Sequence, residues 1–282
     1  MSQYAVGTVI DRRYRVVGHA GTGGSGSVYR TVDLLTDQHV ALKVLHRSID
    51  DGEVRRRFHR EFQLLARVSH PGIVRTLGWG AHDGRPYFTM EWVSGETLEK
   101  ALSDVATLQE LRRGSFAHFV GQIAKALGHI HHLGMVHRDV KPSNIMLSRS
   151  SCTGGFSVTI LDLGLARFRE RGNSAITELG VTVGTAEYMS PEQGRGSWVD
   201  QRSDLYSLGV VLYELLVGSP PFRGRSPVSV ILKHIWEVPP PLPESVLDSG
   251  VSAQGIVLRL LEKEPIARYQ SAADLLLDLG KI

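Results

Sequence analysis

Short alternating apolar runs occupy the first third of the chain, and longer helical repeats occupy the rest. Between residue 14 and about residue 93 the alternation has the period of β-strands. The predicted strands are residues 14–17, 28–32, 40–44 and 87–93, with another beginning near residue 73. One helical stripe interrupts them near residues 51–68, where Val54, Phe58, Glu61 and Leu65 share a helix face.

Helical spacing dominates after residue 94. Apolar residues recur from Phe116 to Ile130 at the spacing of one helix face, and Gly134 ends that helix. Residues 204–217 are apolar nearly all round, which predicts a buried helix that Gly218 ends. At about 14 residues, this helix is too short to span a bilayer. Further helices are predicted at residues 228–236 and from Ser271 onward.

Composition narrows the classes of function only modestly. A chain of 282 residues can bury one large core or two smaller ones. Its net charge of +3 is too small to favour nucleic-acid binding. The single cysteine, Cys152, excludes an intrachain disulfide, and the N-terminus has no signal-peptide pattern. We therefore expect a cytoplasmic protein with no membrane segment in this chain and no nucleic-acid partner.

The chemistry centres on residues 136–147, a polar loop between two apolar runs. Asp139 can accept a hydroxyl proton, Lys141 can neutralise a phosphate oxygen, and Asn144 can ligate a cation. His137-Arg138-Asp139 followed by Asn144 resembles the catalytic loop of protein kinases. A lysine two residues after the aspartate is the form seen in serine/threonine-specific members.

A glycine-rich segment lies near the N-terminus. Its spacing is G-x-G-x-x-G-x-V, which alone also suits a dinucleotide site or a flexible loop. A β-branched strand follows it instead of a helix, so it resembles the phosphate-covering loop of kinases. The implied nucleotide-binding residues are Gly21, Gly23, Gly24, Ser25, Gly26 and Val28. Where the family usually has a large aliphatic residue, the chain has His19-Ala20, so we expect a looser adenine cover and a mobile loop.

The same resemblance extends to the other nucleotide contacts. Residues 40–44 are similar to the family's V-A-I-K strand, so Ala41 would face adenine and Lys43 the phosphates. Glu61 lies on an apolar helix stripe and would pair with Lys43, because an unpaired buried carboxylate is costly. The segment connecting the two parts of the chain would meet adenine through Met90, Glu91 and Val93.

Asp162-Leu163-Gly164 resembles the metal-binding D-F-G motif, with leucine in place of phenylalanine. Asp162 and Asn144 would hold Mg²⁺, with Mn²⁺ as an alternative. Residues 184–192 resemble the end of an activation segment that docks substrate. Arg138 beside the catalytic aspartate implies control by phosphorylation. Autophosphorylation is predicted between residues 168 and 185, at Thr177 first. Ser174 and Thr182 are secondary candidates.

Other polar residues are predicted to support the fold. Asp204 would accept amides of the catalytic loop, Arg268 would pair with Glu192, and His137 would be packed. A histidine cluster at the end of the 116–130 helix could be a metal site or a solvated helix end. We expect solvated side chains, because no cysteine or carboxylate shares their face. The cluster consists of His129, His131 and His132.

The chain is therefore identified as resembling bacterial serine/threonine protein kinases. The resemblance implies an α+β, two-lobed fold with a small antiparallel β lobe, one helix in that lobe, and a larger mainly helical lobe. The expected boundaries are a tail at 1–13 and a kinase domain at 14–280, divided into 14–93 and 94–280.

The expected reaction is transfer of the γ-phosphate of ATP, bound between the lobes, to serine and threonine hydroxyls of proteins. Two copies of the chain would associate for autophosphorylation in trans. A pseudokinase scaffold and a small-molecule kinase of the aminoglycoside or choline type are the alternatives. The first normally lacks equivalents of Lys43, Asp139 or Asp162, and the second lacks the docking segment.

Overall fold

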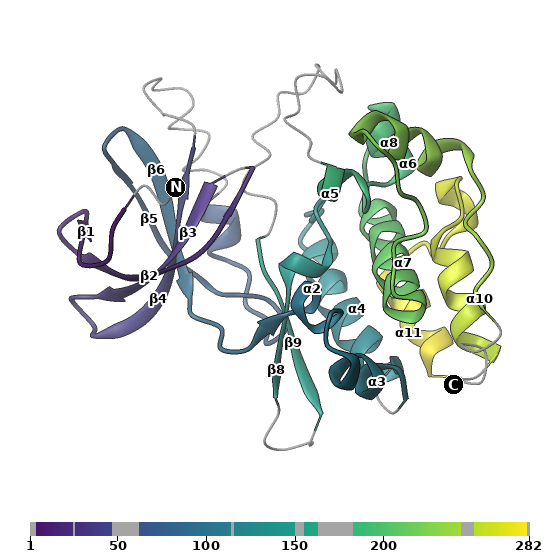
Figure 1. Ribbon diagram of the computed structural model, residues 1–282, viewed down its shortest axis with the longest axis horizontal. Coiled ribbons are helices and arrows are strands. Elements are labelled where there is room, and N and C mark those ends of the chain that lie inside the picture. The colour runs from purple at the N-terminus through teal and green to yellow at the C-terminus, as the bar shows by residue number, and fades with distance from the viewer. Residues whose placement is uncertain are drawn as a thin grey trace. The chain divides into compact units, whose positions relative to one another are not determined.

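The computed structural model describes residues 4–24, 26–46, 62–113, 116–149, 155–162, 183–243 and 251–280. The chain divides into two compact units (Figure 1). We call the described residues up to Ser94 the N-terminal unit and the described residues from Gly95 onward the C-terminal unit. Each unit contains the kind of element that the apolar spacing of its sequence predicts.

An antiparallel sheet forms the N-terminal unit, with strand order β1-β2-β3-β4-β6-β5. Its strands are β1 (Val9–Ile10), β2 (Tyr14–Gly23), β3 (Gly26–Asp33), β4 (Gln38–Leu45), β5 (Thr76–His82) and β6 (Arg85–Glu91). The strand expected near residue 73 begins three residues later than predicted, at Thr76. Hairpins join β2 to β3 and β3 to β4.

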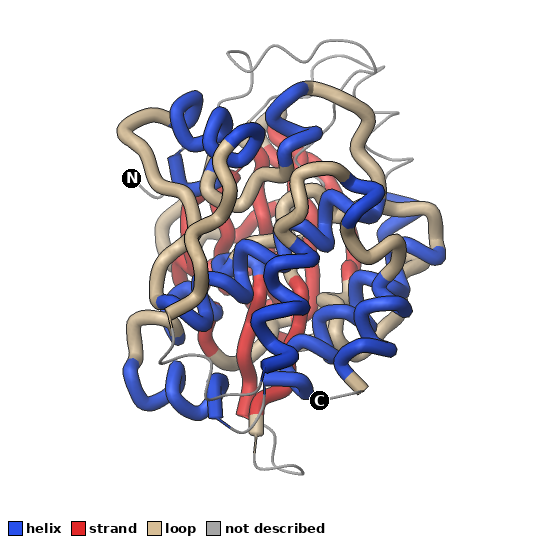
Figure 2. Tube along the Cα trace, turned by 90° about the vertical axis from the view of Figure 1, so that its right-hand side faces the viewer, coloured by secondary structure: helices blue, strands red, loops and turns tan. Residues whose placement is uncertain are grey.

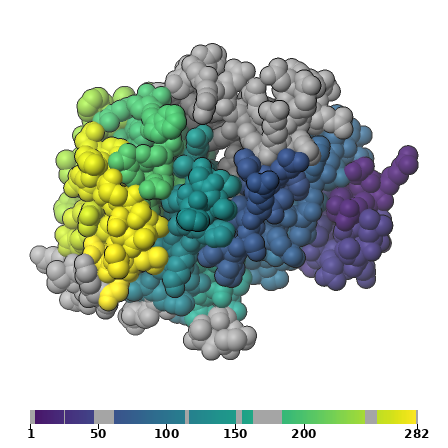
Figure 3. Space-filling view, turned by 180° about the vertical axis from the view of Figure 1, so that it is seen from behind, coloured from purple at the N-terminus to yellow at the C-terminus, as the bar shows by residue number. Residues whose placement is uncertain are grey.

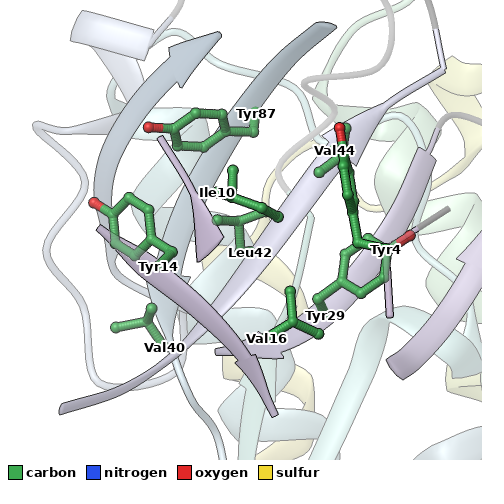
Figure 4. Packing of buried hydrophobic residues seen from close by; sticks show 9 residues of the cluster. All are labelled: Tyr4, Ile10, Tyr14, Val16, Tyr29, Val40, Leu42, Val44 and Tyr87. Atoms are coloured by element: carbon green, nitrogen blue, oxygen red, sulfur yellow. The ribbon is translucent and has the colours of Figure 1, made fainter. Parts of the chain in front are cut away.

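One face of this sheet carries a cluster of buried side chains (Figure 4). Its members are Tyr4, Ile10, Tyr14, Val16, Tyr29, Val40, Leu42, Val44 and Tyr87. Two of them, Tyr4 and Ile10, precede residue 14, in the segment expected to be a tail, and Ile10 lies on β1, which pairs with β2 at the edge of the sheet. The Tyr87 hydroxyl donates a hydrogen bond to the Asp11 carboxylate. Burial, reinforced by this carboxylate, raises the pKa of Tyr87.

The helix expected at residues 51–68 is described only at its C-terminal end. Residues 62–65 are helical, and the Ala66 amide donates to the Phe62 carbonyl at 2.9 Å. Leu65 is buried, as its place on the apolar stripe predicts. Glu61, the expected partner of Lys43, lies outside the described residues.

Helices make up most of the C-terminal unit (Figure 2). They are α2 (Leu98–Ala101), α3 (Val105–Arg113), α4 (Phe116–His132), α5 (Val183–Ala186), α6 (Pro191–Arg195), α7 (Gln201–Val217), α8 (Pro227–Trp236), α10 (Val251–Leu260) and α11 (Ala272–Leu279). A small antiparallel sheet joins β7 (Glu96–Thr97), β8 (Ile145–Arg149) and β9 (Phe156–Ile160). Two short 3₁₀ helices, η1 (Pro142–Asn144) and η3 (Pro265–Ala267), complete the unit.

The buried helix predicted at residues 204–217 is α7, which begins earlier, at Gln201. Asp200 caps it by accepting a hydrogen bond from the Arg202 amide, and Gly218 ends it with a left-handed φ of 90°. No helix among the described ranges is long and apolar enough to cross a bilayer.

Elsewhere in the C-terminal unit, α11 packs against α4. A Cβ added at Gly128 would lie 3.2 Å from the Ala272 Cβ, so glycine lets the two helices approach closely. Figure 3 shows the yellow C-terminal residues beside the teal part of the chain. Ser271 caps α11 by accepting from the Asp274 amide, as predicted for the start of the last helix.

Candidate active site

The loop before β8 holds three predicted catalytic residues close together. The Lys141 Nζ lies 3.0 Å from the Asp139 Oδ2. The Asn144 Nδ2 donates to the Asp139 carbonyl at 2.8 Å and to its Oδ2 at 3.1 Å. Both bonds use the amide nitrogen, so the Asn144 oxygen is the atom oriented to ligate a cation. The sequence prediction that these side chains form one group is correct.

Asp204 sets the conformation of this loop from the first turn of α7. Its carboxylate accepts the amides of His137 at 2.8 Å and Arg138 at 2.7 Å. This confirms the predicted supporting role, and the positive end of the α7 dipole favours the charge.

Arg138 has a φ of 64°, which is unfavourable for a residue with a side chain. The conformation persists because the Asp204 carboxylate holds the Arg138 amide and Gln193 holds its carbonyl. Gln193 donates this bond through Nε2 at 2.9 Å. The backbone leading into Asp139 is therefore fixed from both sides.

His137 is packed, as predicted. Only 1% of it is exposed, and its Nε2 lies 3.0 Å from the Leu161 carbonyl. Its Nδ1 accepts from the Asp139 amide at 3.2 Å. A neutral ring that donates through Nε2 satisfies both contacts. This ring joins the catalytic loop to the segment that carries Asp162.

Asp162 follows β9, which pairs with β8 directly after the catalytic loop. The Leu161 amide donates to the Asn144 carbonyl at 2.8 Å, so Asp162 lies one residue beyond a direct contact with Asn144. Asp162 has a φ of 50°, another left-handed residue next to the catalytic loop. An amide oxygen and a carboxylate are hard oxygen ligands, so this pair of side chains suits a magnesium ion. The next two residues, Leu163 and Gly164, lie outside the described part of the chain.

The predicted phosphate loop is the β2–β3 hairpin of the N-terminal unit. A Cβ at Gly26 would lie 2.3 Å from the Val44 carbonyl oxygen, so packing against β4 requires glycine there. A Cβ at Gly21 or Gly23 would meet nothing within 4 Å. Space beside these two glycines suits the close approach of an external group such as a phosphate. Ser25 lies outside the described residues, while Gly24 and Val28 belong to the described hairpin.

Five predicted nucleotide contacts lie on β4, on β6 or just after it. Ala41 pairs with Met90 in the β4–β6 register, and both are buried. Lys43 is 5% exposed, and its Nζ lies 5.8 Å from the Phe88 ring centroid. The Glu91 amide donates to the Arg75 carbonyl at 3.0 Å, and Glu91 pairs with Val40 at the end of β6. Val93 follows β6 and is partly exposed.

The family model described as the protein kinase domain matches residues 14–277. The chain belongs to the protein kinase domain family. This kinase domain is 39% identical to the serine/threonine-protein kinase PknB of Mycobacterium tuberculosis over 277 residues, which cover 96% of this chain and 43% of PknB. It is 40% identical to the serine/threonine-protein kinase pkn3 of Myxococcus xanthus over 273 residues, 95% of this chain and 49% of pkn3. The chain thus spans less than half the length of these curated relatives.

A solved structure agrees with this assignment. The kinase domain of Mycobacterium tuberculosis PknI matches with a TM-score of 0.72 and 26% identity, covering 99% of both chains. The fold is the protein kinase fold, an N-terminal antiparallel sheet with a mainly helical second lobe, as the motifs predicted. The chain is a protein kinase domain, similar to those of bacterial serine/threonine-protein kinases. Membership of this family implies the use of ATP and a divalent metal.

The docking segment of the kinase domain is described from Val183 onward. Ser207 donates its hydroxyl to the Tyr188 carbonyl at 2.7 Å, and the Tyr188 hydroxyl donates to Glu214 at 2.5 Å. Burial raises the pKa of Tyr188 and of Glu214. Arg268 forms the predicted pair with Glu192, with nitrogen–oxygen distances of 2.8 and 2.9 Å. These contacts join the docking segment to α7 and to the loop before α11.

The prediction of solvated histidines is wrong for His131. Its side chain is 5% exposed, and its Nε2 lies 2.8 Å from Asp204. The sequence reading missed this contact because the carboxylate belongs to α7, 73 residues away. In the described ranges, no group of three or more histidine, cysteine, aspartate or glutamate side chains is arranged to hold a metal.

Sequence reasoning also missed Gln193, which supports the catalytic loop through Arg138. Ser190 and Gln193 form a reciprocal capping box at the start of α6. The S-x-x-Q spacing is a recognisable start signal for a helix and could have identified Gln193 as ordered. Its contact with Arg138 depends on tertiary structure and had no local signal. The predicted phosphorylation sites Ser174, Thr177 and Thr182 lie outside the described residues.

Proposed function

We propose that this chain transfers the γ-phosphoryl group of ATP to serine and threonine hydroxyls of protein substrates. The observation that carries the proposal is the group formed by Asp139, Lys141 and Asn144 on a loop held by Asp204. A hydroxyl acceptor, an ammonium group and a cation ligand are the parts that phosphoryl transfer needs within one small region. The two curated relatives, PknB and pkn3, are both named serine/threonine-protein kinases, which supports the choice of substrate hydroxyl.

Each side chain has a distinct proposed role. Asp139 orients the substrate hydroxyl and accepts its proton as the oxygen–phosphorus bond forms. Lys141 neutralises charge on the transferred group, and Lys43 neutralises the phosphates that remain on the nucleotide. Asn144 and Asp162 hold the divalent ion, which stabilises charge on the phosphates when it is bound. Positioning and charge neutralisation supply most of the rate, because the transition state is loose.

The remaining nucleotide contacts are proposed for the N-terminal unit. The amides of the β2–β3 hairpin would meet phosphate oxygens, since Gly21 and Gly23 have open space where a side chain would project. Ala41 and Met90 offer neighbouring apolar surfaces to the base. Glu91 would accept a hydrogen bond from the base through its carbonyl, and Val93 would offer backbone groups. Glu61 is proposed as the partner that holds Lys43.

The test is Asp139→Asn, which keeps the shape of the side chain and removes its basicity. We expect kcat for phosphotransfer to a generic protein substrate to fall by about 10²–10⁴-fold. Lys43→Met should abolish transfer with the fold retained, as judged by circular dichroism. Asp37→Asn is a matched control, because Asp37 is exposed in a turn with a φ of 55° that asparagine tolerates. Full activity in Asp139→Asn would refute the proposal, and ATP binding without transfer by the unaltered chain would favour a scaffold.

Autophosphorylation in the segment between residues 168 and 185 remains part of the proposal. Arg138 is exposed and lies next to Asp139, where its guanidinium could pair with a phosphate of about −1.5 to −2 charges. We expect Thr177→Ala, purified without prior phosphorylation, to activate more slowly than the unaltered chain. Equal rates of activation would move the assignment to Thr182 or Ser174, which mass spectrometry of the phosphorylated chain can distinguish.

A further inference from the structure

A chain of four hydrogen-bonded side chains lies across the glycine-rich hairpin. The His19 Nε2 is 2.9 Å from the Thr22 hydroxyl, which is 3.1 Å from the Ser27 hydroxyl. The Ser27 hydroxyl is in turn 3.3 Å from the His46 Nε2. We call these four residues the hairpin clamp. It connects β2 to β3 and then to the end of β4, three successive parts of the sheet.

The hairpin clamp lies on the face of the sheet opposite to the proposed nucleotide contacts. Thr22 pairs with Ser27, and the His19 ring packs edge-on against Tyr29, a member of the buried cluster. Successive side chains of a strand point to opposite faces, so Val28 faces away from Ser27 and Tyr29. Val28 pairs with Lys43 across β3 and β4. The clamp therefore restrains the hairpin without occupying the face where nucleotide is proposed to bind.

Thr22 is the natural anchor for the glycine-rich segment. Residues 21–24 are Gly-Thr-Gly-Gly, so Thr22 carries the only side chain in that stretch. It contacts both His19, on its own strand, and Ser27, on the next. A Cβ at Gly21 or Gly23 would touch nothing within 4 Å, so packing does not restrain these two residues. Among the described residues of this segment, the Thr22 hydroxyl is thus the side-chain group that links β2 to β3.

Ser27 extends this series of hydrogen bonds to the end of β4. It is buried, with 7% exposure, although its hydroxyl is polar. His46 directly follows β4, three residues after Lys43. The hydroxyls and ring nitrogens can form a continuous donor–acceptor series, because each hydroxyl both donates and accepts. The glycine-rich turn is therefore tied to the strand that carries the proposed phosphate-binding lysine.

From this geometry we infer that Thr22 and Ser27 are positioning residues for ATP, acting through the hairpin backbone rather than by touching the nucleotide. The inference rests on the proposed function, because it assigns the hairpin to phosphate binding. Backbone amides bind phosphates better when they are already arranged, since less conformational entropy is lost on binding. The hairpin clamp supplies that arrangement in a chain that has Ala20 where protein kinases usually have a large aliphatic residue before the first glycine.

The experiment measures ATP affinity and hairpin opening separately in the 282-residue chain. Thr22→Val removes the hydroxyl and keeps the branched shape, and Ser27→Ala removes its partner. We expect each to raise the Kd for a fluorescent ATP analogue by about 3–10-fold, the loss expected for one or two hydrogen bonds. Amide hydrogen exchange of residues 21–24 without nucleotide should become faster, and the thermal midpoint should change little. Thr22→Ser should restore both affinity and protection.

Two further variants test whether a loss of ATP affinity comes from the hairpin clamp or from substitution of a hydroxyl residue in general. The double variant Thr22→Val/Ser27→Ala should lose less affinity than the two single losses added together, because both substitutions remove the Thr22–Ser27 hydrogen bond. Ser157→Ala, at an exposed strand position of β9, is the matched control and should leave Kd unchanged. Unchanged affinity in Thr22→Val, or equal losses in Thr22→Val and Thr22→Ser, would overturn the inference alone. Failure of the unaltered chain to bind ATP would overturn the proposed function and the inference together.

Discussion

Removal of the Arg268 guanidinium tests how the docking segment is held. The Arg268 side chain is fully buried, and all five of its N–H groups donate. Two bonds go to the Glu192 carboxylate at 2.8 and 2.9 Å. The other three go to the backbone carbonyls of Glu262, Arg202 and Lys263 at 2.7, 3.0 and 2.9 Å. The guanidinium thus connects α6, α7 and the turn that follows α10.

The expected cost of Arg268→Met follows from these contacts. Bonds to a charged acceptor contribute roughly 1.5–3 kcal/mol each, and bonds to neutral carbonyls roughly 0.5–1.5 kcal/mol each. The cost of burying both charges offsets part of this gain. Deleting one partner of a buried pair leaves an uncompensated charge, so we expect a loss of about 3–5 kcal/mol in the free energy of unfolding at pH 7.

The direction in which the cost of Arg268→Met changes with pH can also be predicted. Burial alone raises the pKa of Glu192, but the hydrogen bonds and charge of Arg268 and the Ser203 hydroxyl together hold it below its usual value. The pair therefore stabilises the unaltered protein above the unfolded pKa of about 4.5, and this stabilisation is lost as pH falls through the folded value. In Arg268→Met, burial without the cation raises the pKa of Glu192 instead. The loss of unfolding free energy caused by Arg268→Met should therefore be smaller at pH 5 than at pH 7.

Guanidinium denaturation followed by tryptophan fluorescence measures this difference. Arg149→Met is the matched control, because its pair with Glu110 is exposed and should contribute at most about 1 kcal/mol. Arg268→Met/Glu192→Leu should recover part of the loss, since no buried carboxylate remains. A deficit below about 1 kcal/mol, or one that does not change with pH, would refute the reasoning.

Three further outcomes are expected. Asp204→Asn replaces an acceptor oxygen with a donor opposite the amides of His137 and Arg138. The kcat should therefore fall at least about tenfold, and the free energy of unfolding by about 1–3 kcal/mol. An unchanged kcat would contradict the supporting role. Gly26→Ala should lower the denaturation midpoint, because its Cβ would lie 2.3 Å from the Val44 carbonyl oxygen. Gly21→Ala should instead weaken ATP binding and leave the denaturation midpoint unchanged. The reverse pattern would disprove the assignment of the hairpin. Chelation by EDTA should stop phosphotransfer. It should leave the thermal midpoint of the nucleotide-free protein unchanged, because Mg²⁺ held by one carboxylate and one amide needs phosphate oxygens as well. A lowered thermal midpoint would indicate a resident structural metal.

Local sequence patterns were sufficient for the elements that carry the site. The alternation at residues 40–44 predicted β4, and the apolar run at 204–217 predicted most of α7. The spacing from Asp139 to Asn144 also predicted a compact group, because a five-residue separation on a short loop leaves few conformations. Period and spacing are local properties of the chain, so they can be read without knowing what packs against them.

Contacts between distant segments depended on tertiary structure. The sequence placed His131 at a solvated helix end, but the fold brings it against Asp204 and buries it. The segment before Tyr14 has no strong strand pattern, yet β1 pairs with β2 and buries Ile10. A polar residue becomes buried when the fold supplies a partner from far along the chain, and a short strand forms when a neighbouring edge accepts its hydrogen bonds. Neither partner is visible in a local window, and for that reason these contacts, like the hairpin clamp, emerged only from the folded chain.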